Sequence, residues 1–152
     1  MGLDMYLYAR KGHPIEENNE INNHYSQNIL YYENQYLKYA SSNTLIEIAY
    51  WRKAHAIHSW FVQHIQNGVD DCGSYLLSKE KASELINVID TILKARNQSK
   101  EELQMLIESL LPGLVFGLTE YNGQYFHALS YTKKSLLKAI DYMDKDYIVT
   151  YR

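Results

Sequence analysis

The sequence has a single cysteine, only two prolines and no long apolar run. One cysteine, Cys72, cannot form a disulfide within the chain, which is typical of a reducing cytoplasm. No apolar segment reaches the roughly 18 residues of a membrane span, and the N-terminal residues lack the pattern of a secretory signal peptide. We therefore expect a soluble, cytoplasmic protein that does not enter a membrane.

Basic residues are also scarce, with 15 Lys and Arg against 18 Asp and Glu and a formal net charge of −3. The largest basic clusters are the pairs Arg10–Lys11 and Lys133–Lys134, whereas binding through phosphate neutralisation needs a basic face. This balance argues against general nucleic-acid binding. The phosphate-binding, nucleophile-elbow and kinase motifs are missing as well, so the sequence indicates no catalytic residue and no cofactor.

Apolar and tyrosine side chains, by contrast, are plentiful. The 152 residues are 46% hydrophobic, enough for one domain with its own core, and neither a repeat nor a linker divides them. Tyrosine occurs 15 times. Its apolar ring and polar hydroxyl suit half-buried strands, core edges and contact surfaces. The chain is thus predicted to be one domain over residues 1–152.

The segment 46–65 is predicted to be a central, mostly buried helix, because two adjoining apolar stripes run along it at steps of three or four. One stripe comprises Ile48, Trp51, His55, His58, Val62 and Ile65. The other comprises Tyr50, Ala54, Ile57, Phe61 and Ile65. Thr44 and Glu47 have the spacing of a capping box that would begin this helix.

Strands and further helices are expected around it. Alternation predicts a strand over 2–10, and short apolar runs predict strands over 74–77 and 114–121. Ser78 and Ser99 are predicted to cap helices whose apolar stripes extend to about 93 and 111. These elements predict an α+β domain in which helices pack on a small mixed or antiparallel sheet.

Four segments leave more than one interpretation open. Residues 11–28 are polar and long for a connection, which favours a mobile loop over a functional one. Residues 29–39 fit a strand or a helix. Asn122–Gly123 favours a hairpin over 121–131, but the apolar spacing beyond it favours a helix over 124–143. The tail after residue 143 is expected to form an edge strand or to remain loose.

An aromatic and cationic cluster is the best candidate for a binding surface: Tyr50, Trp51, Arg52, Lys53 and Trp60. Tryptophan, tyrosine and arginine dominate the binding energy at interfaces, and they also stack on planar ligands. The competing interpretation is that both tryptophans belong to the core and that Arg52 pairs with an acidic residue.

A second group of candidates consists of His55 and His58, three residues apart, and Asp70 and Asp71, which follow the predicted helix. A zinc site needs three or four ligands, and this histidine spacing supplies two, so we expect no resident metal. The commoner outcome is that the histidines bond to nearby groups and that both aspartates bond backbone amides in a turn, with Cys72 packed as a small apolar residue.

Four segments, MGLDMYLY, EIAYWRKAHAIHSWFV, DDCGSYLLS and LPGLVFGLTEY, resemble a widespread group of small phage and prophage proteins of unknown function. The resemblance covers most of the chain outside residues 11–40. That group usually has Asn at the position of His55, which implies no metal role for this histidine. The resemblance implies an accessory protein of a mobile element that acts inside a bacterial host cell, where such proteins often disable a host factor or sequester a defence signal.

The leading hypothesis is a non-enzymatic, self-associating (homo-oligomeric) binding protein, either a counter-defence inhibitor of a host protein or a sponge for a small nucleotide-like ligand. The candidate binding residues are Tyr50, Trp51, Arg52, Lys53, His55, His58, Trp60, Asp70 and Asp71. The alternative is a small metal-dependent hydrolase or nucleotide-processing enzyme that uses His58, Asp70 and Asp71.

Overall fold

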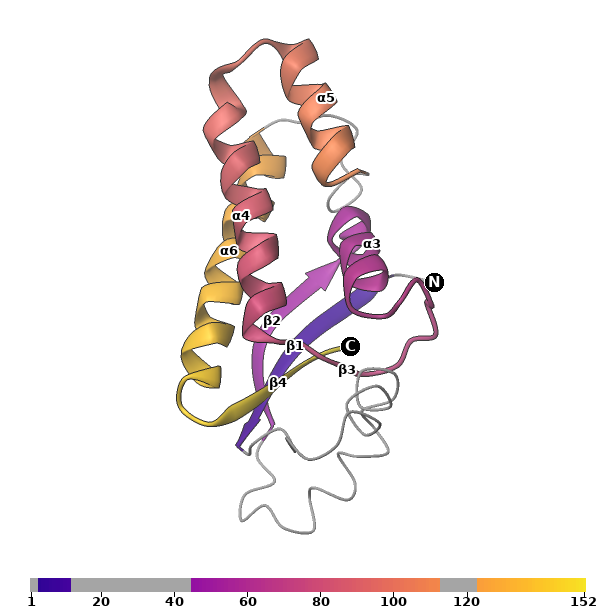
Figure 1. The fold of residues 1–152 in the computed structure, drawn as a ribbon, viewed down its shortest axis with the longest axis vertical. Helices are drawn as coiled ribbons and strands as arrows, with labels where there is room; N and C mark the ends of the chain where they lie inside the picture. The colour runs from indigo at the N-terminus through magenta and orange to yellow at the C-terminus, as the bar shows by residue number, and fades with distance from the viewer. Residues whose placement is uncertain (1–2, 12–44, 113–122) are drawn as a thin grey trace.

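A computed structural model describes residues 3–11, 45–112 and 123–152 of the chain (Figure 1). These residues form a four-stranded antiparallel sheet and four α-helices that pack on it, which confirms the predicted α+β class. The predicted loop over 11–28, except Lys11, the segment 29–39 and the predicted strand 114–121 lie outside the described residues.

The sheet has the strand order β2-β1-β4-β3. Its strands are β1 (Asp4–Lys11), β2 (Ile46–Arg52), β3 (Tyr75–Leu76) and β4 (Tyr147–Tyr151). Burial alternates along β1 as the sequence predicts, with Met5, Leu7 and Ala9 in the core. The tail was expected to form an edge strand or to remain loose. It does form a strand, but an interior one, because β4 pairs with β1 on one side and β3 on the other.

The helix predicted over 46–65 is only half correct. Residues 46–52 form β2, and the helix α3 begins at His55 and ends at His64. Glu47 therefore lies in a strand and does not have its predicted role in a helix capping box. The pattern of buried residues did not distinguish the two structures, because Trp51, Ala54 and Ile57 would be buried in one long helix and are also buried in the observed strand and helix. Pairing with β1 supplies backbone hydrogen-bond partners for residues 46–52 and favours the strand. Lys53 has a positive φ of 56°, so the strand ends before it and the helix begins two residues after it.

The other helices lie close to their predicted positions. They are α4 (Lys79–Lys94), extended by the 3-10 turn η1 (Ala95–Asn97), α5 (Lys100–Leu110) and α6 (Gly123–Met143). The hydroxyls of Ser78 and Ser99 accept hydrogen bonds from the backbone N–H groups of Lys81 and Glu102, as expected of N-caps. Residues 123–143 adopt the helix and not the rival hairpin.

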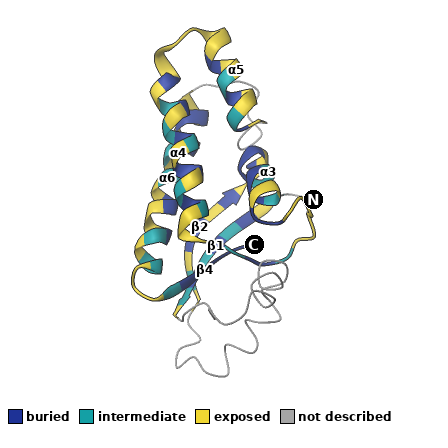
Figure 2. Cartoon of the chain, viewed as in Figure 1, coloured by how far each residue is buried: buried dark blue, intermediate teal, exposed yellow. Residues whose placement is uncertain are grey.

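One continuous core lies between the sheet and the helices. Helix α6 packs on β1, β2 and β4, and α4 runs beside α6 beyond the end of the sheet (Figure 1). The sides of these helices that face each other and the sheet are buried (Figure 2). The buried Trp51 indole N–H donates to Thr132 Oγ1 of α6 at 3.0 Å, and the Phe61 ring of α3 stacks on Tyr151 with 3.9 Å between centroids. The fold thus fixes α3 over one end of the sheet.

Candidate functional site

The candidate aromatic and cationic residues do not share a helix face. Tyr50, Trp51 and Arg52 belong to β2, whereas Trp60 belongs to α3. Trp51 is 0% and Trp60 4% exposed, so both tryptophans are core residues and the competing interpretation holds for them. Arg52, Lys53 and His55 are exposed. The prediction that these side chains form one helical surface is wrong, because the chain changes from a strand to a helix around Lys53.

Tyrosines gather instead on the face of the sheet opposite the core. Tyr6 and Tyr8 alternate with the core residues of β1, and their rings stack at 5.5 Å. Tyr50, paired with Tyr6 across the strands, has its ring 5.0 Å from that of Tyr6. The Tyr50 hydroxyl donates to Asp4 Oδ1 at 2.8 Å. Alternation in the first strand places Asp4, Tyr6 and Tyr8 on one face, but nothing local in the sequence marks them as part of a site.

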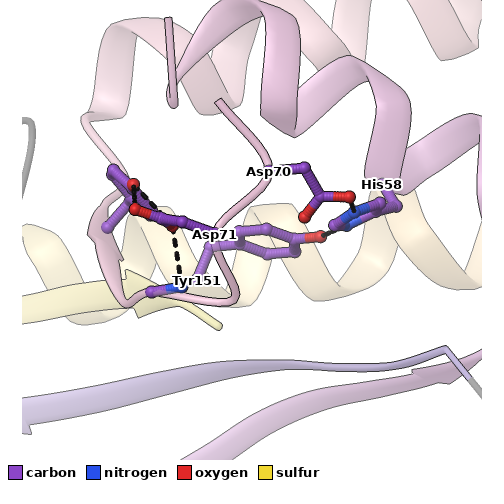
Figure 3. Close-up of polar contacts among 6 residues, drawn as sticks. His58, Asp70, Asp71 and Tyr151 are labelled. Carbon is purple, nitrogen blue, oxygen red and sulfur yellow. Dashed lines mark hydrogen bonds and ion pairs between the residues drawn. The ribbon is translucent and has the colours of Figure 1, made fainter. Parts of the chain in front are cut away.

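His58 of α3 contacts the sheet through one ring nitrogen and the loop after the helix through the other (Figure 3). Its Nε2 lies 3.1 Å from Asp70 Oδ2, and its Nδ1 lies 2.5 Å from the hydroxyl of Tyr151. Because the Asp70 carboxylate can only accept, Nε2 carries the N–H of this contact, and in the tautomer protonated at Nε2 the Nδ1 atom accepts from the Tyr151 O–H. The Tyr151 ring is buried, which raises the pKa of its hydroxyl.

The adjacent Asp71 organises the turn that carries Asp70. Its Oδ1 accepts from the backbone N–H of Gly73 at 2.9 Å and from the Tyr75 hydroxyl at 2.7 Å. These hydrogen bonds, that from Tyr75 first, lower the pKa of Asp71. Burial, followed by the bond to Asp71, raises the pKa of Tyr75 to about 12. Asp71 thus bonds a backbone amide as expected, whereas Asp70 binds His58 and Cys72 is exposed.

A cavity of about 500 Å³ lies beside this network. His58, Asp70, Cys72 and Tyr151 form one part of its wall, together with Gln66 and Gly73. The other part comes from the first strand and the last described residues: Leu3, Asp4, Met5, Tyr6, Tyr8 and Arg152. Of the candidates named from sequence, the fold brings only His58 and Asp70 into this cavity.

Gln66 is the most unusual residue of the cavity wall. Its side chain is only 4% exposed, and its buried Oε1 accepts no hydrogen bond from the residues that the structure describes. Buried amide oxygens are satisfied in the great majority of cases, and an orphan costs on the order of 1–3 kcal/mol. No pattern in the sequence marks Gln66, since a glutamine just after a helix is ordinarily a solvent-exposed residue.

The metal site of the alternative hypothesis is not assembled by the residues described. Within 3–11, 45–112 and 123–152, no three His, Cys, Asp or Glu side chains are grouped as metal ligands. His55 is exposed at the start of α3, and Asp71 bonds Tyr75 and Gly73.

Comparisons of the chain with family models, with curated proteins and with solved structures find no match. The resemblance to small phage proteins therefore stays a prediction. None of the helices described is both long and apolar enough to cross a membrane.

Proposed function

We propose that this protein is a non-enzymatic binding protein that holds a small ligand, or a side chain of a host protein, in the cavity between His58 and Tyr6. The observation that supports the proposal is the cavity of about 500 Å³ itself, whose wall contains the His58–Asp70 pair, Tyr151 and the buried Gln66.

The His58 network supports binding because it holds the cavity wall in a fixed shape. Asp70 and Tyr151 each contact one ring nitrogen of His58, and the ring of Phe61 stacks on that of Tyr151. A preorganised wall lowers the conformational entropy lost when a ligand binds. The same contacts leave neither nitrogen of His58 free to take a proton from a substrate, which favours binding over general base catalysis.

A role in phage counter-defence is the biological setting we propose for this binding, on the resemblance of the sequence alone. The enzymatic alternative draws its support from one contact, the pairing of Asp70 with His58, which is also how hydrolases orient a histidine. Assays of nucleotide turnover by the purified protein, with and without divalent metal ions, test that alternative directly.

Native mass spectrometry of the protein purified from a bacterial host tests the binding proposal. We expect a bound small molecule or a captured protein that is lost from Gln66→Leu, which keeps the side-chain volume but removes the amide from the cavity wall. His55→Gln is the matched control, because His55 is exposed on the same helix outside the cavity. Retention of the same species by folded Gln66→Leu would overturn the proposal.

A further inference from the structure

We infer that the cavity beside His58 is an open strand position in the sheet, and that it takes an extended, basic segment of a protein partner as an added strand. This inference rests on the proposed function and specifies the form of its ligand, a stretch of main chain. It is drawn from the register of β1 and β4, the composition of the cavity wall and the charges on the two faces of the sheet.

Strand β1 extends beyond the end of its neighbour β4. Tyr6 exchanges two backbone hydrogen bonds with Arg152, at 2.8 and 3.0 Å, and β1 continues past this pair to Asp4. Backbone groups alternate between the two neighbours of a strand, so the N–H and C=O of Asp4 point to the same side as those of Tyr6. The carbonyl of Leu3 accepts from the N–H of Lys53 on the β2 side, as this alternation requires. Among the residues described, none pairs with Asp4 on the side of β4.

The cavity occupies the track that a longer β4 would follow. Its wall contains the start of β1 (3–6), the end of β4 (151–152) and the two residues before Ser74 and β3 (72–73). A gap within a sheet is open to both faces of that sheet, which explains why side chains from opposite faces line one cavity. Residues 3–5 lie beyond the last β1–β4 pair, so the gap has room for about three extended residues at roughly 3.3 Å each.

An extended peptide would complete the sheet at this position. Its residue opposite Asp4 can donate to the Asp4 carbonyl and accept from the Asp4 N–H, which repeats the pair of bonds between Tyr6 and Arg152. Proteins bind peptides in this way at open strand positions, where main-chain bonds give affinity and alternate side chains give specificity. On the other side of the gap, the N–H of Gly73 already bonds Asp71 Oδ1 at 2.9 Å, so β1 supplies the main-chain partners.

The charges on the two faces favour basic side chains. Successive side chains of a strand point to opposite faces, so one side chain of the peptide lies on the face of Asp4 and the next lies on the face of His58 and Asp70. Both carboxylates are exposed, and Arg152 is the one Lys or Arg among the described residues of the wall. Opposite charges on facing strand positions stabilise the pairing, and like charges weaken it. Two consecutive lysines would thus meet one carboxylate on each face.

Three tetrapeptides with blocked ends test the main chain and the charge separately on the wild-type protein. They are Val-Lys-Lys-Val, the same peptide N-methylated at both lysines, and Val-Glu-Glu-Val. Calorimetry measures their affinities, and amide hydrogen exchange followed by NMR reports on the N–H of Asp4. Met5 is the internal control for exchange, because its N–H faces β2.

We expect the lysine peptide to bind and to slow exchange at Asp4 but not at Met5. N-methylation, which removes the main-chain donors, and the replacement of both lysines by glutamates should each weaken binding about tenfold. In the protein, Asp4→Pro removes the N–H at the first residue of β1, a position where a strand tolerates proline. Asp4→Ala, the matched control, removes the same carboxylate and keeps the N–H, so it should weaken binding less than Asp4→Pro does.

Equal affinity for the N-methylated and unmodified lysine peptides, tighter binding of the glutamate peptide, or no binding of the lysine peptide would overturn the inference. Equal losses in folded Asp4→Pro and Asp4→Ala would contradict the main-chain contact. The proposed function is judged separately, by whether the species retained by the wild-type protein is lost from Gln66→Leu. A species lost in that way that contains no peptide segment would leave the binding function standing and remove only the added strand.

Discussion

The hydroxyl of Tyr131 bonds both backbone groups of Tyr50. Its oxygen lies 3.2 Å from the Tyr50 nitrogen and 3.3 Å from the Tyr50 carbonyl oxygen, and it accepts from the former and donates to the latter. Tyr50 belongs to β2, an edge strand, and pairs with Tyr6 in a position where its own N–H and C=O point away from β1. One side chain of α6 therefore occupies the place that a further strand would take.

Tyr131→Phe should expose this part of the β2 edge. We expect a loss of about 1 kcal/mol in the free energy of unfolding, because two backbone groups lose their partner, together with more self-association at high concentration. Denaturant unfolding and size-exclusion chromatography measure the two effects. Tyr142→Phe on the same helix is the control, since its hydroxyl makes no hydrogen bond to the residues described. Equal behaviour of both variants would contradict the edge role.

Thr132→Val should be more costly than its small change of shape suggests. The Thr132 hydroxyl accepts from the buried Trp51 indole at 3.0 Å and donates to the Ala128 carbonyl at 2.9 Å. Valine preserves the volume and leaves the indole N–H unpaired, so we expect a loss of about 1–3 kcal/mol in chemical denaturation. Thr91→Val is the matched control, because that hydroxyl bonds a helix carbonyl on an exposed surface. A similar loss in both variants would contradict the explanation.

Two glycines of the 66–73 loop should respond differently to alanine. A Cβ at Gly73 would lie 2.9 Å from Asp71 Oδ1 and 3.1 Å from the Tyr75 ring, so Gly73→Ala must disturb the bond between those residues. Gly68 has φ of 80° with open space around it, so Gly68→Ala costs about 1 kcal/mol of backbone strain alone. Both should lower the midpoint of unfolding, but only Gly73→Ala should alter ligand binding. Unaltered ligand binding by Gly73→Ala would show that the turn around Asp71 does not shape the binding site.

Alkaline pH should remove a contribution that Tyr75 makes to stability. Its pKa rises from 10.0 to about 12 on folding, so the folded state favours the protonated hydroxyl. The contribution is complete below pH 10 and is lost as the pH rises from 10 to 12. Tyr75→Phe cannot ionise, so the stability difference between wild type and Tyr75→Phe should shrink over that range. A difference that stays constant would refute the linkage.

Local signals in the sequence predicted the helices α4 and α5 well. The serine caps and the single apolar stripes of α4 and α5 involve residues within a few positions of one another, so no distant partner decides them. The segment 46–52 was misjudged because its burial pattern fits a helix and a strand equally, and β1, about 40 residues earlier in the chain, decides between them. The interior place of β4 depends on β1 in the same way.

The candidate site was only partly predictable. The sequence drew attention to His58 and Asp70, but their structural partner Tyr151 follows His58 by 93 residues, and no spacing rule connects them. Gln66 carries no sequence signal at all, since its orphan oxygen is a property of the packed fold. Trp51 and Trp60 were ambiguous because a tryptophan is equally suited to a core and to an interface, and burial assigned them to the core.

The central position of β4 has a consequence for folding during synthesis. Leu7 pairs with Tyr151, so the contact that joins the two halves of the sheet spans nearly the whole chain. A ribosome-bound chain can form the β1–β2 pair and the helices early, but it cannot close the sheet until residues 147–151 emerge. Topologies of such high contact order fold slowly, and an incomplete chain would present the unpaired edge of β1 to its neighbours.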